Sequence, residues 1–352
     1  MSDKLIPATI LTGFLGSGKT TLLKRVLTEM HGQKIAVIEN EFGEENIDNE
    51  ILVSDTTEQI MQLSNGCVCC TIREDLRSTL SLLAERRRKG ELKFERVVIE
   101  TTGLADPGPV AQTFFMDDEI AESYLLDSVL TLVDAKHAQE QLDLRQEARL
   151  QVGFADQIFI SKADLVEPAA VEALQRRLRR MNPRAAMQQV HFGEVPLSKV
   201  FDLKGFNLNT TLEIDPDFLN ADAHSHDHHD HAGHAGHDHA EGEACDHPHH
   251  HAHDDDVKSF VFRSDRAFNA TKLEDFLAAI VQVYGPKMLR YKGVLWMKGS
   301  DKKVIFQGVH QMMGSDLGPK WAPNEKKNNK MVFIGIDLPK EILLQGLEGC
   351  LV

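Results

Sequence analysis

Between residues 5 and 200, short apolar runs rich in branched side chains alternate with stretches of helical spacing. The clearest helical stretch repeats apolar residues at i, i+1, i+4, i+5 and i+8, beginning at Leu22 and ending at Met30. This alternation predicts βαβ units and an α/β fold, a mainly parallel sheet with helices on both faces that binds ligands at the carboxyl ends of its strands. The predicted strands are residues 8–11, 34–38, 96–100, 128–134, 157–160 and 188–191.

The pattern changes beyond residue 256, where a smaller, antiparallel α+β unit is expected. No nucleophile, base or ligand cluster stands out there. Trp296 with Arg290 and Lys292 is interpreted as a core tryptophan flanked by surface charges, with partner contact as the alternative. We assign this unit to recognition of a client protein or of a second copy. Its predicted strands are residues 257–263, 290–297, 304–310 and 331–338, and its predicted helices are 273–284 and 342–351.

Residues 221–256 separate the two patterns and have a composition of their own. They hold ten Asp or Glu, no Lys or Arg, and 13 of the 17 histidines, without any Leu, Ile, Val, Phe or Met. Because such a segment has too few apolar side chains to form a core, we expect a disordered linker when metal is absent. The predicted boundaries are a first domain at 1–220, the linker at 221–256 and a second domain at 257–352.

The histidines of this linker are candidate ligands for divalent ions, because neutral imidazoles bind such metals. Flexible, interchangeable sites suit metal capture or buffering better than a catalytic centre, and a merely soluble spacer is the alternative. Cys245 is a further candidate ligand. The first group of candidate ligands is His224, His226, His228, His229 and His231.

Net charge and the N-terminal sequence exclude several classes of function. A net charge of −15 argues against a general binder of nucleic acid or of anionic membranes. No apolar run reaches the roughly 18 residues of a membrane-spanning helix. The N-terminal stretch runs into glycines and Lys19 without the order of a signal peptide, and the five cysteines form no disulfide framework. A cytoplasmic location is therefore expected.

The strongest motif is GFLGSGKT at residues 13–20, which matches G-x-x-x-x-G-K-[ST] between a predicted strand and a predicted helix. Glycines in such a loop let backbone N–H groups surround phosphate oxygens, and the helix N-terminus adds its positive end. Lys19 is expected to reach the β- and γ-phosphates, and Thr20 to ligate Mg²⁺. The residues predicted to contact the nucleotide here are Gly13, Gly16, Ser17, Gly18, Lys19, Thr20 and Thr21.

A second phosphate element is predicted in RVVIETTG, residues 96–103. Its apolar run ends in Glu100, which at the tip of a buried strand is suited to hold Mg²⁺ or its water. Gly103 would let the backbone approach the γ-phosphate and move when it is lost. The alternative is an ordinary strand end followed by a turn, but the P-loop upstream favours a functional role. The candidate catalytic residues are Lys19, Thr20 and Glu100.

The base-binding element is predicted in FISKAD, residues 159–164. Asp164 is suited to accept hydrogen bonds from N1–H and the N2 amine of guanine together, whereas adenine would present an acceptor to the same carboxylate. The Lys162 stem would lie over the purine. Ser161 stands where this motif usually has Asn and would replace only part of its bonding. The order of the three motifs favours GTP over ATP.

Three of the five cysteines lie in SNGCVCC, residues 64–70. A disulfide between Cys69 and Cys70 would be strained, because a good bridge needs Cα atoms about 5.5 Å apart. A thiolate metal site that includes Cys67 is favoured, and small buried thiols in a turn are the alternative.

The motifs together resemble one known family. TGFLGSGKTTLL, IENEFGE (38–44), NGCVCC (65–70), ETTGLADPGP (100–109) and RYKGVLW (290–296) are similar to CobW-type P-loop GTPases, and most similar to the YjiA-like members. The resemblance covers nearly the whole chain except the histidine-rich tract. It implies a metal-dependent GTPase that acts as a metallochaperone or metal-insertion factor, for zinc, cobalt or, in some members, iron.

The chemistry of the cysteines agrees with that implication. Zn²⁺ takes four ligands in a tetrahedral shell, so three thiolates leave a fourth position that is open or filled by a carboxylate, which suits a transferable ion. Glu39, the first acid of ENEFGE, is the candidate fourth ligand. The alternative is that the acids of this segment are solvated loop residues or serve Mg²⁺.

We interpret the sequence as a GTPase that delivers Zn²⁺, with Co²⁺ or another divalent ion as the alternative cargo, to a client metalloprotein. Unassisted turnover is expected to be slow, since no arginine finger or water-positioning Gln can be named. One rival is a metal store with a vestigial nucleotide site. Another is an ATP-dependent P-loop kinase or ligase with a structural zinc knuckle. Metal-dependent association of two copies is left open.

Overall fold

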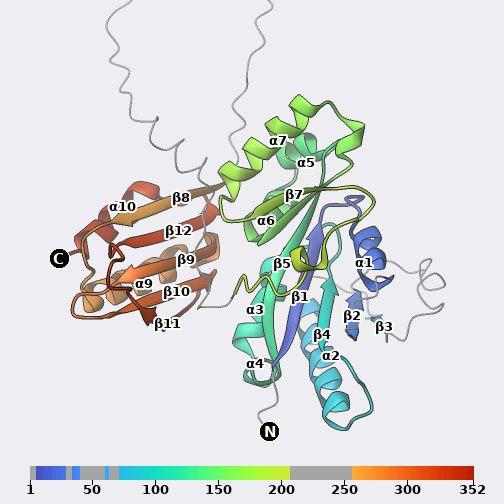
Figure 1. Cartoon of the computed structure of the whole chain (residues 1–352), viewed down its shortest axis with the longest axis horizontal. Helices are drawn as coiled ribbons and strands as arrows, with labels where there is room; N and C mark the ends of the chain where they lie inside the picture. Colours follow the sequence, from blue (N-terminus) through green and yellow to red (C-terminus); the bar gives the residue numbers. More distant parts are fainter. Residues whose placement is uncertain (1–4, 29–33, 40–59, 63–70, 207–255) are drawn as a thin grey trace, which may run out of the picture.

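The protein is described by a computed structural model over residues 5–28, 34–39, 60–62, 71–206 and 256–352 (Figure 1). The predicted cysteine site and nearly all of the predicted linker lie outside these residues. Of that linker only Asp256 is described, and it forms an ion pair with Arg149 of the first domain, at 2.5 Å between Nε and Oδ1.

The first domain is built on a seven-stranded sheet in the order β3-β2-β4-β1-β5-β6-β7, in which every neighbouring pair is parallel. The predicted α/β fold is confirmed, and each predicted strand is present, 96–100 with the predicted ends and the others with shifted ends. The strands are β1 (Ile6–Gly13), β2 (Ile35–Glu39), β3 (Ile60–Gln62), β4 (Arg96–Glu100), β5 (Tyr124–Asp134), β6 (Gln157–Ser161) and β7 (Ala186–Val190).

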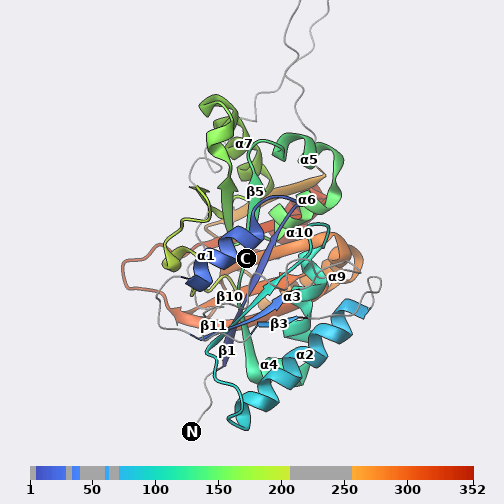
Figure 2. The same ribbon diagram turned by 90° about the vertical axis from the view of Figure 1, so that its right-hand side faces the viewer.

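Helices cover both faces of this sheet, because alternate strand residues point to opposite sides. Leu11 of β1 packs with α1 on one face, whereas Ile10 packs with α3 and α6 on the other (Figures 1 and 2). The four described members of the predicted helical stripe, Leu22, Leu23, Val26 and Leu27, are buried as expected, and Met30 lies outside the described residues. The helices are α1 (Lys19–Thr28), α2 (Thr71–Arg88), α3 (Pro107–Met116), α4 (Asp118–Ser123), α5 (Ala138–Leu144), α6 (Gln146–Phe154) and α7 (Pro168–Met181).

The second domain is a five-stranded antiparallel sheet in the order β11-β10-β9-β12-β8, with two helices packed on one face. The predicted α+β layer is confirmed, although the edge strand β11 was not predicted. Its elements are β8 (Val257–Ser264), α9 (Ala270–Tyr284), β9 (Met288–Trp296), β10 (Lys302–Val309), β11 (Met312–Lys320), β12 (Asn329–Ile336) and α10 (Lys340–Gly349).

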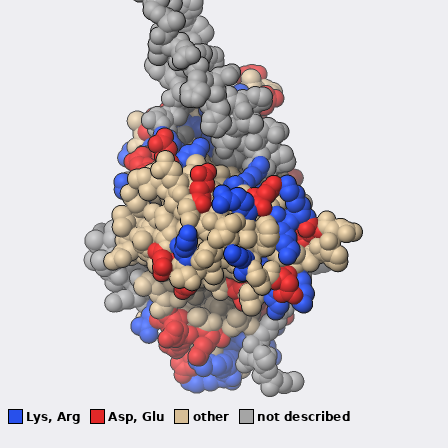
Figure 3. Space-filling view, turned by 90° about the vertical axis from the view of Figure 1, so that its left-hand side faces the viewer, with Lys and Arg blue, Asp and Glu red and all other residues tan. Residues whose placement is uncertain are grey.

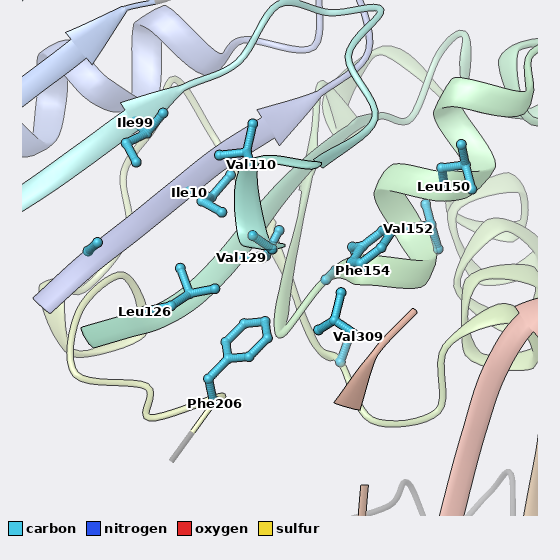
Figure 4. Packing of buried hydrophobic residues seen from close by; sticks show 14 of the residues in the cluster. Ile10, Ile99, Val110, Leu126, Val129, Leu150, Val152, Phe154, Phe206 and Val309 are labelled. Atoms are coloured by element: carbon cyan, nitrogen blue, oxygen red, sulfur yellow. The ribbon is translucent and has the colours of Figure 1, made fainter. Parts of the chain in front are cut away.

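The two domains share one hydrophobic cluster. Val309 of β10 and Ile334 of β12 belong to the same buried cluster as Val152 and Phe154 of α6. Figure 4 shows Val309 beside Phe154, with Val129 of the central sheet behind them. The second domain therefore packs on the face of the large sheet that carries α3 and α6, opposite α1.

The expectation of surface charges beside Trp296 is wrong. Arg290 and Lys292 are buried at the domain boundary, and Trp296 is only half-buried. Arg290 bonds Asp156 at 2.8 Å and donates from the same nitrogen to the Phe154 carbonyl, also at 2.8 Å. Arg184 bonds the same carboxylate at 3.0 Å. A charge can be buried when it is paired and hydrogen-bonded, and Asp156 supplies that pairing from the first domain.

The outer surface of the second domain carries charges of both signs. Lys and Arg lie beside Asp and Glu around uncharged residues on this face, without a broad field of one sign (Figure 3). Among the helices that the structure describes, none combines the length and apolar character needed to cross a bilayer.

Candidate nucleotide-binding site

The predicted phosphate loop links the end of β1 to the start of α1, at the carboxyl edge of the large sheet. Its glycines allow this turn: Gly13 has φ +144°, and a Cβ there would lie 2.5 Å from the Leu132 carbonyl oxygen and 2.8 Å from Ser17 Oγ. Gly16 has φ +74° and faces open space. The loop is therefore closed toward the sheet and open on the side where a phosphate would enter.

The polar groups of this loop fit an anion. Lys19 Nζ folds back to donate to the carbonyl oxygens of Gly13, at 2.9 Å, and of Phe14, at 3.4 Å. Among the described residues, buried Ser17 Oγ finds no hydrogen-bond partner. Such a group is costly unless a ligand or water satisfies it. Thr21 lies exposed in the first turn of α1, and its predicted contact with the nucleotide stays a prediction.

The corner expected to hold Mg²⁺ brings together oxygen ligands from three elements. Thr20 Oγ1 donates to Glu100 Oε1 at 3.2 Å, although the two residues are 80 apart in sequence. Glu39 is the register partner of Glu100 across β2 and β4, and it is buried. Hydroxyl and carboxylate oxygens are the ligands that Mg²⁺ prefers, so this donor set fits the ion. Glu39 thus lies beside the predicted Mg²⁺ corner, and its predicted role at zinc stays a prediction.

The segment after Glu100 lies against the phosphate loop. Thr101 is held there by its N–H, which donates to the Leu11 carbonyl at 2.9 Å, and by its hydroxyl, which donates to Thr12 Oγ1 at 2.9 Å. A Cβ on Gly103 would lie 2.6 Å from the Leu15 backbone nitrogen. Only glycine permits this approach, which brings the Gly103 backbone to the loop where the nucleotide phosphates are expected.

The predicted base element follows β6, two strands from β1 in the sheet, and is packed onto the phosphate loop. Ser161 Oγ donates to the Ser17 carbonyl at 2.7 Å, so this serine does supply a bond to the loop. Lys162 Nζ donates to the Gly16 carbonyl at 2.8 Å and bonds Asp134 at 2.7 Å. Asp164 is half-exposed, as a base-binding carboxylate must be before its ligand arrives.

Three residues of this region were missed in the sequence. Asp134, at the end of β5, holds Lys162, and its place at a strand end was the available signal. His191 follows β7 and lies 3.5 Å from Asp164 between Nδ1 and Oδ1. Gln151 of α6 donates to the carbonyls of Gly103 and Ala105, at 3.1 and 3.0 Å. Only the fold brings Gln151 to that loop, so no local pattern marks it.

The predicted transition-metal site cannot be placed. Cys67, Cys69 and Cys70 and the histidines from His224 to His231 lie outside the described residues. Within the described ranges, no group of three or more His, Cys, Asp or Glu is arranged to hold a metal ion. Of the predicted zinc ligands, Glu39 alone is described.

These elements define a P-loop nucleotide-binding protein with an acidic strand end beside its phosphate loop and a second, antiparallel domain. Residues 7–189 match the CobW/HypB/UreG nucleotide-binding domain, and residues 257–351 match the cobalamin synthesis protein CobW C-terminal domain. The chain belongs to the CobW/HypB/UreG family, as its motifs predicted.

The relatives that the chain resembles match different shares of it. The zinc chaperone YjiA of Escherichia coli is 39% identical over 346 residues, which is 98% of either chain. The zinc-regulated GTPase metalloprotein activator 1 of Schizosaccharomyces pombe is 36% identical over 214 residues, 58% of this chain and 51% of its own length. The crystal structure of the Zn(II)-bound E. coli YjiA GTPase superposes with a TM-score of 0.74 at 35% identity, covering 99% of both chains.

Proposed function

We propose that this protein is a GTPase that couples GTP binding and hydrolysis to delivery of zinc to a client metalloprotein. The observation that carries the proposal is the convergence of Lys19, Thr20 and Glu100 at the mouth of an open phosphate loop. The names of the relatives support the rest, since they include a zinc chaperone and a GTPase metalloprotein activator. We place this activity in the cytoplasm, with Co²⁺ or another divalent ion as alternative cargo.

The residues of the phosphate loop bind and orient GTP. Lys19 Nζ exchanges the loop carbonyls that it contacts now for oxygens of the β- and γ-phosphates, where its charge opposes the charge of the transition state. Thr20 and Glu100 hold Mg²⁺, which when bound neutralises phosphate charge. Gly103 presents its backbone to the terminal phosphate, and Asp164 selects guanine through two charge-assisted hydrogen bonds.

The cysteine segment is the proposed zinc carrier, with Cys67, Cys69 and Cys70 as thiolate ligands. This segment lies in the sequence between Glu39 and Glu100, which are register partners at the nucleotide site. A metal held by this segment is therefore linked to the Mg²⁺ corner along the chain in both directions, over 28 residues from Glu39 to Cys67 and 30 residues from Cys70 to Glu100. Glu39 is proposed as the shared residue, able to serve either ion.

The nucleotide part is tested by measuring turnover of GTP and of ATP on one purified sample whose zinc content has been determined. We expect slow hydrolysis of GTP and little of ATP. Preference for ATP would favour a P-loop kinase or ligase, and a zinc-rich sample without any turnover would favour a metal store.

The coupling is tested by zinc affinity, measured by competition with a chelating dye in the presence of a non-hydrolysable GTP analogue and then of GDP. Linkage requires that each ligand changes the affinity of the other by one common factor, and typical coupling gives about a 5- to 150-fold difference. We expect tighter zinc binding with the GTP analogue. Cys67→Ala should abolish the difference and leave nucleotide affinity unchanged. Equal affinities in both states would leave the cysteines with a structural role only.

A further inference from the structure

The loop between Glu100 and α3 is held in place by hydrogen bonds from within the first domain. Buried Gln151 of α6 donates to the carbonyl oxygens of Gly103 and Ala105. Asp106 then caps α3 by accepting from the Gly108 N–H at 2.8 Å. The segment from Gly103 to Gly108 is thus a short, anchored connection between the phosphate loop and α3.

The far end of this segment lies against the second domain. His310 forms the tip of the β10–β11 hairpin, and a Cβ on Gly108 would lie 2.5 Å from His310 Nε2 and 2.9 Å from Phe154 Cζ. The His310 ring also packs on the Phe154 ring, with centroids 5.3 Å apart. A side chain at position 108 would therefore collide with the ring of His310, so only glycine fits there.

His310 is held firmly in this position. Its φ is +52°, in the left-handed region that non-glycine residues seldom adopt. Its N–H donates to the Met288 carbonyl at 2.8 Å, and its Nδ1 lies 3.2 Å from the Pro286 carbonyl oxygen. Non-glycine residues in this region persist when their surroundings over-determine them, and such residues cluster at functional sites.

The electrostatics support a contact between His310 and the cap of α3. Burial raises the pKa of Asp106, while the attraction of His310 lowers it. Burial lowers the pKa of His310, and the attraction of Asp106 raises it. Each group therefore lies within the field of the other, and the interaction joins the two domains at the first turn of α3.

We propose that His310 is a positioning residue for GTP hydrolysis, through which the second domain holds the Gly103–Gly108 segment against the phosphate loop. The inference rests on the proposed GTPase function. His310 touches no expected substrate atom and acts through Asp106 and Gly108. Because the contact is mutual, a shift of Gly103 on loss of the terminal phosphate displaces the hairpin tip, so the second domain registers the nucleotide state.

The test uses His310→Asn in the full-length protein. Asparagine tolerates positive φ and keeps a donor at the position of Nδ1, so the hairpin and its bond to Pro286 are retained. It lacks the reach of Nε2 toward Gly108. We expect kcat for GTP to fall by about 10-fold or more, since small misplacements near a reacting centre have effects of that size. KM should stay within about twofold, because phosphate binding by the P-loop is left intact.

The matched control is Gln311→Ala, which alters the other residue of the same hairpin tip. Gln311 packs on Gly285 of the second domain, so this variant should keep wild-type kcat. A similar loss of kcat in both variants would mean that only hairpin folding matters and would overturn the proposal. Wild-type kcat in His310→Asn would do the same.

A second measurement separates this inference from the proposed function. Amide hydrogen exchange of Gly108, Val110 and Ala111 reports the first turn of α3 without any turnover. Exchange should be faster in His310→Asn than in wild type and unchanged in Gln311→Ala. If the wild-type protein hydrolyses no GTP, the proposed function fails, and unchanged exchange in His310→Asn would then overturn the domain contact as well.

Discussion

Two regions beside the central sheet, the phosphate loop and the domain boundary, are built in opposite ways. At the phosphate loop, no described atom lies within 4 Å of a Cβ built on Gly16, and buried Ser17 Oγ has no hydrogen-bond partner in the part of the chain that the structure describes. At the domain boundary the space is filled: a Cβ on Gly153 of α6 would lie 2.7 Å from Leu289 Cδ1 and 3.2 Å from Val257 Cγ1. The first region is open for a ligand, whereas the second is closed by a neighbouring domain. Substitutions should therefore affect activity in one and stability in the other.

The largest effect is expected for Lys19→Ala. Removing one preorganised donor from a transition-state site costs about 100- to 1,000-fold in kcat. The melting temperature should change little, because Lys19 is only partly buried and bonds loop carbonyls that water can solvate. Phosphate release and thermal unfolding on the same preparation check both parts. Lys24→Ala, on the same helix, is the control that should keep both properties.

Asp164→Asn should come next. Asparagine keeps one acceptor oxygen, so one of the two hydrogen bonds is lost; at about 1.5–3 kcal/mol for a bond to a charged acceptor, GTP binding should weaken about 10- to 150-fold. The variant should gain affinity for xanthosine triphosphate, whose C2 carbonyl accepts from the new amide. Titration of the variant and the wild type with both nucleotides measures this change in nucleotide preference. Glu194→Gln, an exposed acid paired with Arg25, should leave both affinities unchanged, and unaltered GTP binding in Asp164→Asn would remove this residue from the base site.

Gly153→Val tests the closed side of the comparison. The added side chain must push Leu289 and Val257 apart, and overpacking of this kind lowers the free energy of unfolding by about 1–3 kcal/mol. Denaturant unfolding measures the loss. Gly349→Val is the matched control, because Gly349 is also helical but has no atom within 4 Å of its Cβ position. Equal losses in both variants would show that helix propensity, rather than the domain boundary, sets the cost.

The smallest effect is expected from Lys292→Met, and it depends on pH. Burial and the charges of Arg184 and Arg290, only partly offset by Asp156, lower the pKa of Lys292 to about 8, from an ordinary value of 10.5. Between these two values the unfolded chain holds a proton that the folded chain has released, so wild-type stability rises with pH across this window.

The variant lacks that contribution. The difference in melting temperature, Lys292→Met minus wild type, should therefore be most positive at pH 7.5 and shrink toward pH 10. Thermal unfolding of both proteins across that range measures it. A difference that does not vary with pH would mean that Lys292 keeps its ordinary pKa in the folded protein.

In the first domain, the features that depend on residues close together in the sequence could be predicted. A phosphate loop needs glycines, a lysine and a hydroxyl within eight residues, so GFLGSGKT can be recognised from the sequence alone. Buried parallel strands likewise appear as apolar runs. Two of the four edge strands, β3 and β11, were not predicted, and the reason is physical. β3 has three residues, and β11, MMGSDLGPK, is mostly exposed and carries two glycines and a proline. Neither has the apolar pattern that burial imposes.

The domain boundary was not predictable because its determinants are far apart in sequence. Arg290 and Lys292 look like surface charges until Asp156, more than 130 residues earlier, is placed beside them. Gln151 and His310 likewise have ordinary neighbours and acquire their contacts only from the fold. The roles of the nucleotide residues stay predictions that the assays above address.

The order of the strands has a consequence for synthesis of the chain. β1 emerges first, yet it lies in the middle of the sheet between β4 and β5. The carbonyls of Gly16 and Ser17 are then fastened by Lys162 and Ser161, which are made almost 150 residues later. Such long-range pairing is slow, because the chain must close a large loop before any contact compensates for the lost entropy. The earliest motif of the sequence is thus completed late, and a nascent chain can bind nucleotide tightly only after most of its first domain has left the ribosome.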